Sequence, residues 1–367
     1  MKIAFITRGA FGVIGGASSY MLPTMLSESN DVLVLSPENS NQKEKKIFTN
    51  RHLNVVKIKS TEIEGMLLEL HLHLQQFKPD IVHIFQNPFC LHYLTVLPGL
   101  LDNAKWILDF RSPLLARNKK SRKRILMRYF LSQFYADHIF THSNLTLKDN
   151  IVLKIRASTE VTFGIDPEKH RPRTKSMYPS LRYVYVGSIS KGRKMGLLIK
   201  SFAEFVIENS SRITLDIFGD GEELVELEKI VNKNKWTFIK MHGAVNQNIL
   251  TSQLQNYDVG IAYVTNDNYS RAPSLKSAEY AASGLSIIAS DTLGHRDWEK
   301  RHGFRYYYFN NTSKGIKRVL AKKYSIKELD DQRQTNFDAV KKFEWKYLVN
   351  NKLMPVYSRL TGEKTEQ

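Results

Sequence analysis

Short apolar runs alternate with longer amphipathic stretches along most of the chain, as in proteins built from parallel strands joined by helices. Six runs in the first half are predicted to form buried strands: 2–7, 32–35, 54–58, 81–85, 106–110 and 138–142. Six more follow in the second half: 182–186, 213–218, 237–241, 259–263, 285–290 and 306–309. The clearest helix spans 61–77, where Leu67, Leu70 and Leu74 share one face. The pattern predicts an α/β protein with helices on both faces of its sheets.

The two series of strands predict two doubly wound domains, which suits a chain of 367 residues of which 42% are hydrophobic. A polar segment with two prolines separates the series. We therefore expect a first domain at 1–168, a linker at 169–180, a second domain at 181–342 and a helical tail at 343–367.

Residues 270–291 combine a turn, a helix and a buried strand, and they carry the clearest chemical signal. Ser274 can cap a helix that begins at Leu275. Unpaired N–H groups at a helix start suit a phosphate, and Lys276 adds a full positive charge there. Glu279, one turn further on, can accept hydrogen bonds from two ribose hydroxyls. These residues predict a nucleoside diphosphate site, and an ordinary helix with a solvated Lys–Glu pair is the structural alternative.

Two glycine-containing loops follow other predicted strands of the second domain. Gly187 ends a strand and precedes a basic loop, in which Arg193 and Lys194 would lie beside a phosphate. Gly219 and Gly221 permit close backbone approach after the next strand. Ligands of parallel sheets bind at the carboxyl ends of the strands, so both loops are candidates for the same site. A solvated basic turn is the alternative for the first loop.

In order and spacing, these segments resemble the nucleotide-binding part of retaining GT-B glycosyltransferases, the glycosyltransferase family 4-like group also called glycosyl transferases group 1. That family commonly has Pro-x-Lys-x-x-Glu-Tyr, small residues, a glycine and an apolar strand. The matching positions are Pro273, Lys276, Glu279, Tyr280, Gly284 and 285–290. The resemblance covers most of 183–290, with weaker agreement at the N-terminus and in the tail. It implies the GT-B fold, in which two doubly wound Rossmann-like domains face each other across a cleft and the tail crosses back to the first domain.

The resemblance also implies which residues contact the donor nucleotide. Arg193 and Lys194 would hold the diphosphate, residues 242–245 would lie near the base, and a glycine-rich loop of the first domain would face the diphosphate. The full set of expected donor-binding residues is Gly15, Gly16, Gly187, Ser188, Arg193, Lys194, Gly219, Gly221, Val245, Ser274, Leu275, Lys276 and Glu279.

Two positions depart from the family pattern. Arg271 stands where many members have a Glu that contacts the donor sugar, and Ser188 stands where members have an Arg. The family's Lys in the basic loop is replaced by Arg193, which is a good bidentate partner for phosphate.

The expected chemistry follows from the negative charge that develops on the leaving diphosphate when a sugar–phosphate bond breaks. Arg193, Lys194 and the helix start at 274–276 would stabilise that charge, and Glu279 would act with them. No Asp-x-Asp occurs in the chain, so we expect transfer without a metal ion or another cofactor. The resemblance implies retention of the anomeric configuration.

Asp109 and Arg111 are further catalytic candidates, because they follow a strand of the first domain and would face the site from its carboxyl end. Asp109 would orient the acceptor hydroxyl or the donor sugar, and Arg111 would contact an acceptor phosphate. A purely structural Asp–Arg pair is the alternative.

Charge and composition bear on the surroundings of the protein. The net charge is +18, and the single cysteine, Cys90, suits a reducing compartment. Neither a signal peptide nor an apolar stretch of membrane-spanning length is recognisable, so a cytoplasmic location is expected. Residues 117–128 carry seven basic side chains and no acidic one, and apolar residues follow at 129–135. That pattern suits the anionic inner face of a membrane, while a nucleic acid or a solvated helix are the alternatives.

The expected function is transfer of a sugar, from UDP-sugar by preference, to a lipid-linked or cell-surface polysaccharide precursor at the membrane. A nucleotide-sugar epimerase of the same fold is one alternative, and an inactive ligand-binding protein is suggested by Arg271 and Ser188. A basic nucleic-acid-binding protein is another, but the basic run lacks interleaved aromatic residues, so no nucleic acid partner is expected.

Overall fold

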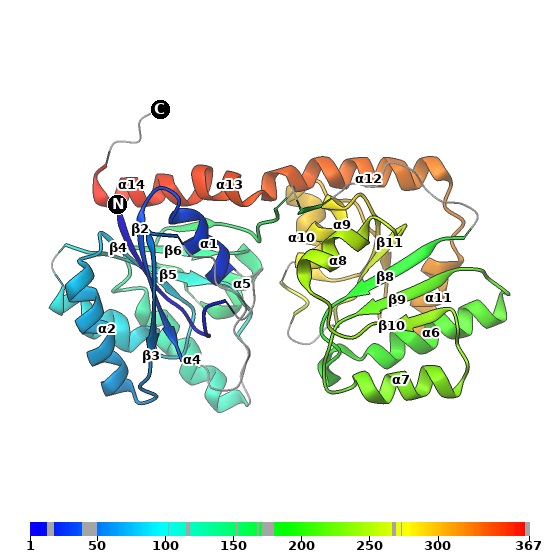
Figure 1. Ribbon diagram of the computed structural model, residues 1–367, viewed down its shortest axis with the longest axis horizontal. Coiled ribbons are helices and arrows are strands. Elements are labelled where there is room, and N and C mark those ends of the chain that lie inside the picture. Colours follow the sequence, from blue (N-terminus) through cyan, green and yellow to red (C-terminus); the bar gives the residue numbers. More distant parts are fainter. Residues whose placement is uncertain are drawn as a thin grey trace. The chain divides into compact units, whose positions relative to one another are not determined.

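The computed structural model contains two α/β units (Figure 1). It describes residues 1–12, 18–38, 50–101, 103–114, 118–151, 153–166, 169–170, 180–265, 269–272 and 274–363. The first unit comprises Met1–Gly164 together with Trp345–Gln367, and the second comprises Ile165–Glu344. The C-terminal segment from Trp345 therefore groups with the N-terminal sheet.

The first unit contains a parallel sheet, whose order among the described residues is β3-β2-β1-β4-β5-β6-β7. Its strands are β1 (Lys2–Ile6), β2 (Asp31–Pro37), β3 (Leu53–Ile58), β4 (Ile81–Phe85), β5 (Lys105–Phe110), β6 (His138–Thr141) and β7 (Ser158–Glu160). Side chains of β4 are buried on both faces of the sheet, which explains the uninterrupted apolar runs in the sequence.

Helices cover both faces of this sheet (Figure 1). They are α1 (Ser18–Leu26), α2 (Ile63–Phe77), α3 (Cys90–Val96), η1 (Leu97–Leu100), α4 (Lys119–Ser132) and α5 (Asn144–Asn150). The C-terminal elements α13 (Trp345–Leu348), η5 (Val349–Leu353) and α14 (Met354–Thr361) add to them. Trp345, Leu353 and Tyr357 pack in one apolar core with Phe5 and Phe140. Burial of these large side chains fixes the tail on the first unit.

The second unit has its own parallel sheet, in the order β10-β9-β8-β11-β12-β13 among the described residues. The strands are β8 (Arg182–Val186), β9 (Thr214–Phe218), β10 (Ile239–Met241), β11 (Val259–Ala262), β12 (Ser286–Ser290) and β13 (Tyr307–Phe309). The helices are η3 (Lys191–Arg193), α6 (Met195–Glu208), α7 (Leu224–Lys233), α8 (Gln247–Leu254), α9 (Leu275–Ala282), α10 (Leu293–His302), α11 (Ser313–Ala321), α12 (Ile326–Val340) and η4 (Lys341–Phe343).

The predicted α/β class and the two doubly wound sheets are confirmed, with some differences in their elements. Strand β7 was not expected, because Ser158–Glu160 is short and polar and forms an edge strand. Helix α12 was not expected either, since polar residues such as Gln332 and Asn336 occupy its buried face. Strand β10 begins two residues later than predicted, because the N–H of Thr237 donates to the carbonyl of Lys235 in a turn.

Candidate functional site

In the second unit, the strand order reverses between β8 and β11, since β9 and β10 lie on one side of β8 and β12 and β13 lie beyond β11. Parallel α/β sheets bind ligands outside the carboxyl ends of the strands at such a reversal. The segments that follow β8, β9 and β11 at this edge contain most of the donor-binding residues predicted from the sequence.

The loops after β8 and β9 lie against each other, and glycines allow this contact. The N–H of Gly187 donates to the carbonyl of Phe218 at 3.0 Å. Gly219 has a φ of +149° and Gly221 a φ of +156°. A Cβ on Gly219 would overlap the carbonyl oxygen of Gly187, and one on Gly221 would lie 2.6 Å from the backbone of Ile189. Backbone packing thus accounts for these glycines, and their contact with a nucleotide stays a prediction.

The basic loop after β8 is joined to the segment after β11. The hydroxyl of Thr265 donates to the carbonyl of Gly192 at 2.7 Å, and that of Tyr263 donates to the carbonyl of Lys194 at 3.3 Å. The guanidinium of Arg193 lies 4.4 Å from the ring centroid of Tyr269, in a cation–π contact. These contacts hold two cationic residues at the reversal in strand order.

Helix α9 supplies the acidic residue of the site. Glu279 is only 5% exposed, and its Oε2 lies 2.7 Å from Nζ of Lys276, in the first turn. Ser274 stands at the predicted N-cap position, but its side chain makes no capping hydrogen bond, so the predicted cap is wrong in that respect. The N–H of Val186 donates to the hydroxyl of Tyr280 at 2.9 Å, which fixes α9 to the end of β8.

One histidine near Glu279 was missed from the sequence. Nδ1 of His170 lies 2.8 Å from the hydroxyl of Ser283, one turn after Glu279. Burial lowers the pKa of His170 and outweighs the nearby carboxylate of Glu279, which acts in the opposite direction. His170 lies in a segment with neither strand nor helix pattern, so no local signal connected it with α9.

The loop after β10 lies beside the loop after β9. The N–H of Gly219 donates to the carbonyl of Gly243 at 2.8 Å, and Val245, two residues further, is half-buried. His242 stacks on Phe218 with ring centroids 4.3 Å apart, and its Nε2 lies 2.5 Å from Oδ1 of Asp216. His242 thus has a structural partner, and the predicted contact of this loop with the base stays a prediction.

Asp109 and Arg111 belong to a buried polar network in the first unit. Oδ2 of Asp109 lies 2.9 Å from Nε2 of His83 and 2.8 Å from Nε of Arg111. Burial tends to raise the pKa of Asp109, but the charge of Arg111 and the hydrogen bonds outweigh it and lower the pKa. Burial lowers the pKa of His83, so its neutral ring donates through Nε2 and accepts from the Tyr357 hydroxyl at 2.6 Å.

The structural Asp–Arg pair that the sequence left as an alternative is therefore present, and Asp109 is fully buried. A catalytic role for either residue stays a prediction. Gly15, Gly16 and Pro273 lie outside the described residues, as does the first residue of the basic run at 117–128. No cluster of three or more His, Cys, Asp or Glu side chains suited to a metal ion occurs in the described part of the chain.

Comparisons with known proteins find similarity to glycosyltransferases. Residues 180–320 match the family model described as glycosyl transferases group 1. A segment of 131 residues, 35% of this chain, is 29% identical to a UDP-N-acetylglucosamine–peptide N-acetylglucosaminyltransferase GtfA subunit of Limosilactobacillus reuteri. The match spans only 24% of that relative's length.

Solved structures resemble the chain over nearly its whole length. A structure of Anabaena Alr3699/HepE in complex with UDP superposes with a TM-score of 0.74 and 12% identity, and covers 99% of this chain and 100% of its own. The sucrose-phosphate synthase of Thermosynechococcus elongatus gives the same TM-score and coverage at 13% identity. At these identities the likeness shows the fold. The chain thus has the GT-B fold, and residues 180–320 of its second unit are similar to the glycosyl transferases group 1.

Proposed function

We propose that the protein is a retaining glycosyltransferase that binds a UDP-sugar at the carboxyl edge of the second sheet. The proposal rests on one observation: the Arg193–Lys194 loop is hydrogen-bonded to the segment after β11. This loop follows β8, and the end of β8 is bonded to Tyr280 of helix α9. The Arg193–Lys194 loop and helix α9 with Lys276 thereby present cationic groups at one reversal of strand order, although they are far apart in the sequence. UDP is favoured as the nucleotide, because the names of similar proteins refer to UDP or UDP-sugars.

In this proposal, the cations act on the leaving group. Arg193 and Lys194 compensate the negative charge that grows on the diphosphate as the sugar–phosphate bond breaks. The partial positive charge at the N-terminal end of α9 acts in the same sense, together with Lys276. Glu279 accepts hydrogen bonds from the ribose, which would take it partly out of its pair with Lys276. Cationic side chains thus do the work that a divalent ion would otherwise do, as the lack of an Asp-x-Asp motif also suggests.

The proposed acceptor is a lipid-linked or cell-surface polysaccharide precursor, reached from a membrane surface by the first unit. We call the outer side of helix α4 and its C-terminal extension the α4 surface. It carries exposed basic residues and exposed apolar ones, and these are Lys119, Lys120, Arg122, Lys123, Arg124, Met127, Leu131, Phe134 and Tyr135. Cations followed by exposed apolar side chains suit an anionic bilayer. Helices of a length and hydropathy that would cross a bilayer do not occur among the described residues.

A nucleotide panel tests the donor assignment. UDP, GDP, ADP and CDP are titrated into the full chain by calorimetry, with and without magnesium, and turnover of UDP-sugars is followed in parallel. We expect selective binding of UDP without magnesium, and a loss of binding of roughly 10- to 100-fold in Glu279→Gln. Glu226→Gln, an exposed carboxylate on α7, is the matched control. Equal affinity for all four nucleotides, or unchanged binding in Glu279→Gln, contradicts the assignment.

The same experiment separates the alternative functions. Isomerisation of the donor sugar without an acceptor would identify an epimerase. Tight, salt-sensitive binding of an oligonucleotide in place of UDP would identify a nucleic-acid-binding protein. Binding of UDP with no turnover under any condition would indicate an inactive member of the family.

A further inference from the structure

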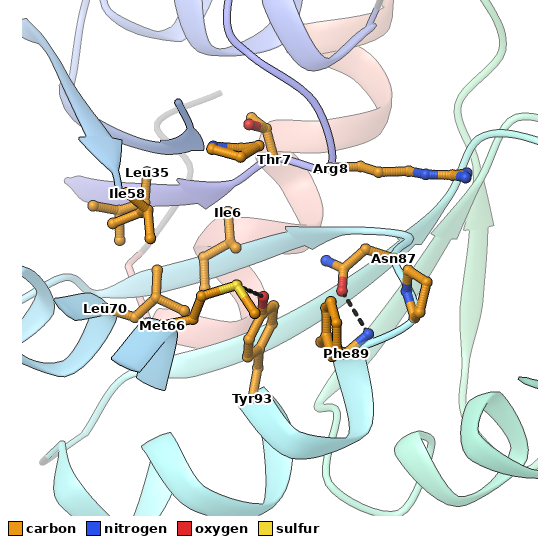
Figure 2. A pocket seen from close by; sticks show the side chains of 12 residues that line it. Ile6, Thr7, Arg8, Leu35, Ile58, Met66, Leu70, Asn87, Phe89 and Tyr93 are labelled. Carbon is orange, nitrogen blue, oxygen red and sulfur yellow. Dashed lines mark hydrogen bonds between the residues drawn. The ribbon is translucent and has the colours of Figure 1, made fainter. Parts of the chain in front are cut away.

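The first unit has a cavity of about 230 Å³ at the carboxyl edge of its sheet (Figure 2). It lies where the strand order reverses, since β1 pairs with β2 on one side and with β4 on the other. Strand ends and two helices form its walls, with Ile6 and Leu35 from strands, Met66 and Leu70 from α2, Tyr93 from α3, and Phe89 just before α3. The position is thus one at which parallel sheets bind ligands, and it is separate from the candidate donor site in the second unit.

The interior of the cavity is apolar. Ile6, Leu35 and Leu70 are at most 3% exposed, and the polar side chains of Thr7 and Asn87 already have partners. The amide of Asn87 donates to the carbonyl of Phe85 at 3.1 Å and its oxygen accepts from the N–H of Phe89 at 2.8 Å. The hydroxyl of Thr7 donates to the carbonyl of Gly9. A sugar would bring several hydroxyls that need partners, so this lining favours a hydrocarbon group.

The hydroxyl of Tyr93 is the exception inside the cavity. Tyr93 is 5% exposed, and its hydroxyl lies 3.8 Å from Sδ of Met66, a weak acceptor. Burial raises the pKa of this hydroxyl, which therefore stays neutral and keeps its proton to donate. It offers one hydrogen bond to an oxygen of a ligand that is otherwise apolar.

Arg8 supplies a cation at the rim. It directly follows the buried Thr7, it is exposed, and the described residues provide no hydrogen-bond or ion-pair partner for it. Figure 2 shows its side chain extending away from the group formed by Ile6, Met66 and Tyr93. A ligand with a hydrocarbon part in the cavity would thus meet a positive charge outside it, which favours an anionic group at that end.

We propose that this cavity binds the hydrocarbon group of the acceptor, carried next to a phosphate that meets Arg8. That the ligand is the acceptor depends on the proposed function. The cavity and the position of Arg8 at its rim do not depend on it. A cavity of about 150 Å³ holds benzene, so this one has room for a group somewhat larger than a single ring. The first segment of an isoprenoid phosphate fits that description, with the saccharide beyond the phosphate and outside the cavity.

Geranyl phosphate is a suitable probe, titrated into the full chain by calorimetry, with inorganic phosphate and geraniol as matched controls. We expect geranyl phosphate to bind at least tenfold more tightly than either control, because only it engages the cavity and Arg8 together. Arg8→Gln, an exposed position, should weaken geranyl phosphate by about tenfold and leave geraniol unchanged. Met66→Phe should weaken the binding of both geranyl phosphate and geraniol, because the larger ring fills the cavity. Tyr93→Phe removes the hydroxyl with little change in shape and so tests its hydrogen bond.

Binding of UDP is measured on each variant, because it reports both folding and the separate donor site. Equal affinity for geranyl phosphate in wild type, Arg8→Gln and Met66→Phe would overturn the proposal. The proposal would also be overturned if geranyl phosphate failed to bind a protein that still binds UDP. The donor assignment would then stand. Binding of geranyl phosphate that depends on Arg8 and Met66, in a protein that does not bind UDP, would support the cavity and overturn the donor assignment instead.

Discussion

The N–H of Val186, at the end of β8, donates to the hydroxyl of Tyr280 in α9 at 2.9 Å, although the two residues are 94 positions apart. Both groups are buried, and the ring of Tyr280 lies against Gly260 of β11, where any Cβ would overlap it. Tyr280 therefore fixes the helix that carries Lys276 and Glu279 to the two strands at the reversal of the sheet.

Replacing Tyr280 by Phe should destabilise the second unit, because it leaves a buried N–H without its acceptor. We expect the free energy of unfolding to fall by about 1–3 kcal/mol, measured by urea denaturation. Tyr307→Phe removes a hydroxyl whose bond to Glu328 is exposed, and should change stability by less than about 0.5 kcal/mol. Equal effects of the two substitutions would show that the bond to Val186 is not important for stability.

Gly219→Ala should disrupt the candidate donor site by separating two loops. The added Cβ would overlap the carbonyl oxygen of Gly187, at a φ that side chains rarely adopt. We expect a loss of about 2–5 kcal/mol in unfolding free energy, together with loss of UDP binding. Gly192→Ala in the neighbouring loop meets no atom within 4 Å and serves as the control. A Gly219→Ala protein with normal stability would contradict the packing described here.

Arg193 is predicted to act on the phosphates and not on the base or ribose. Arg193→Gln should therefore lower the affinity for UDP by roughly 10- to 100-fold, while leaving the affinity for uridine unchanged. The comparison also reveals structural damage, since a displaced loop would weaken both ligands. Competition assays with the two ligands measure the difference, and a parallel loss for UDP and uridine would argue against a direct phosphate contact.

Stability should decrease as the pH falls from 7.5 to 5.5, because buried histidines stay neutral in the folded protein. Burial lowers the pKa of His142 to about 3, and that of His295 to about 4. The unfolded chain binds protons at these residues below about pH 6.5, so each stabilises the fold above that pH and loses its contribution as the pH falls toward its folded pKa. Over this window each such site should cost about 1.4 kcal/mol in total, because the slope approaches about 1.4 kcal/mol per pH unit only well below pH 6.5.

His142→Gln should remove one such contribution, so that its unfolding free energy depends less on pH than that of the wild type. Urea denaturation at pH 5.5, 6.5 and 7.5 gives the two slopes. The variant will also be less stable overall, since Nε2 of His142 bonds to the hydroxyl of Thr146 at 2.9 Å, but only the difference in slope tests the titration. Parallel curves for the two proteins would contradict a neutral buried His142.

The α4 surface should bind anionic vesicles through both its charges and its apolar side chains. We expect sedimentation with phosphatidylglycerol vesicles but not with phosphatidylcholine vesicles, and weaker binding at high salt. Lys120→Gln and Arg124→Gln should each weaken binding by roughly fivefold, about 1 kcal/mol. Phe134→Ser should weaken it without changing the salt dependence. Lys229→Gln on α7 is the control, and an equal effect of that substitution would indicate non-specific attraction by the net charge.

The local pattern of the sequence was sufficient to identify most elements of the fold. Periodicity and apolar runs depend on residues close in the chain, so both sheets and helix 275–282 were predicted, as was the resemblance of 270–291 to a family of transferases. Elements whose burial depends on polar residues, such as α12 with Gln332 and Asn336, escaped this reasoning, because they have no apolar stripe.

Relationships between distant residues were decided by the tertiary structure alone. The order of the strands brings Thr265 to the carbonyl of Gly192, and it brings Tyr357 of the tail to His83. The cavity of the first unit has walls from five separate segments, and no one of them has a binding pattern by itself. Sequence spacing contains no information on such contacts, because they arise only when packing of the whole sheet places its strand ends along one edge.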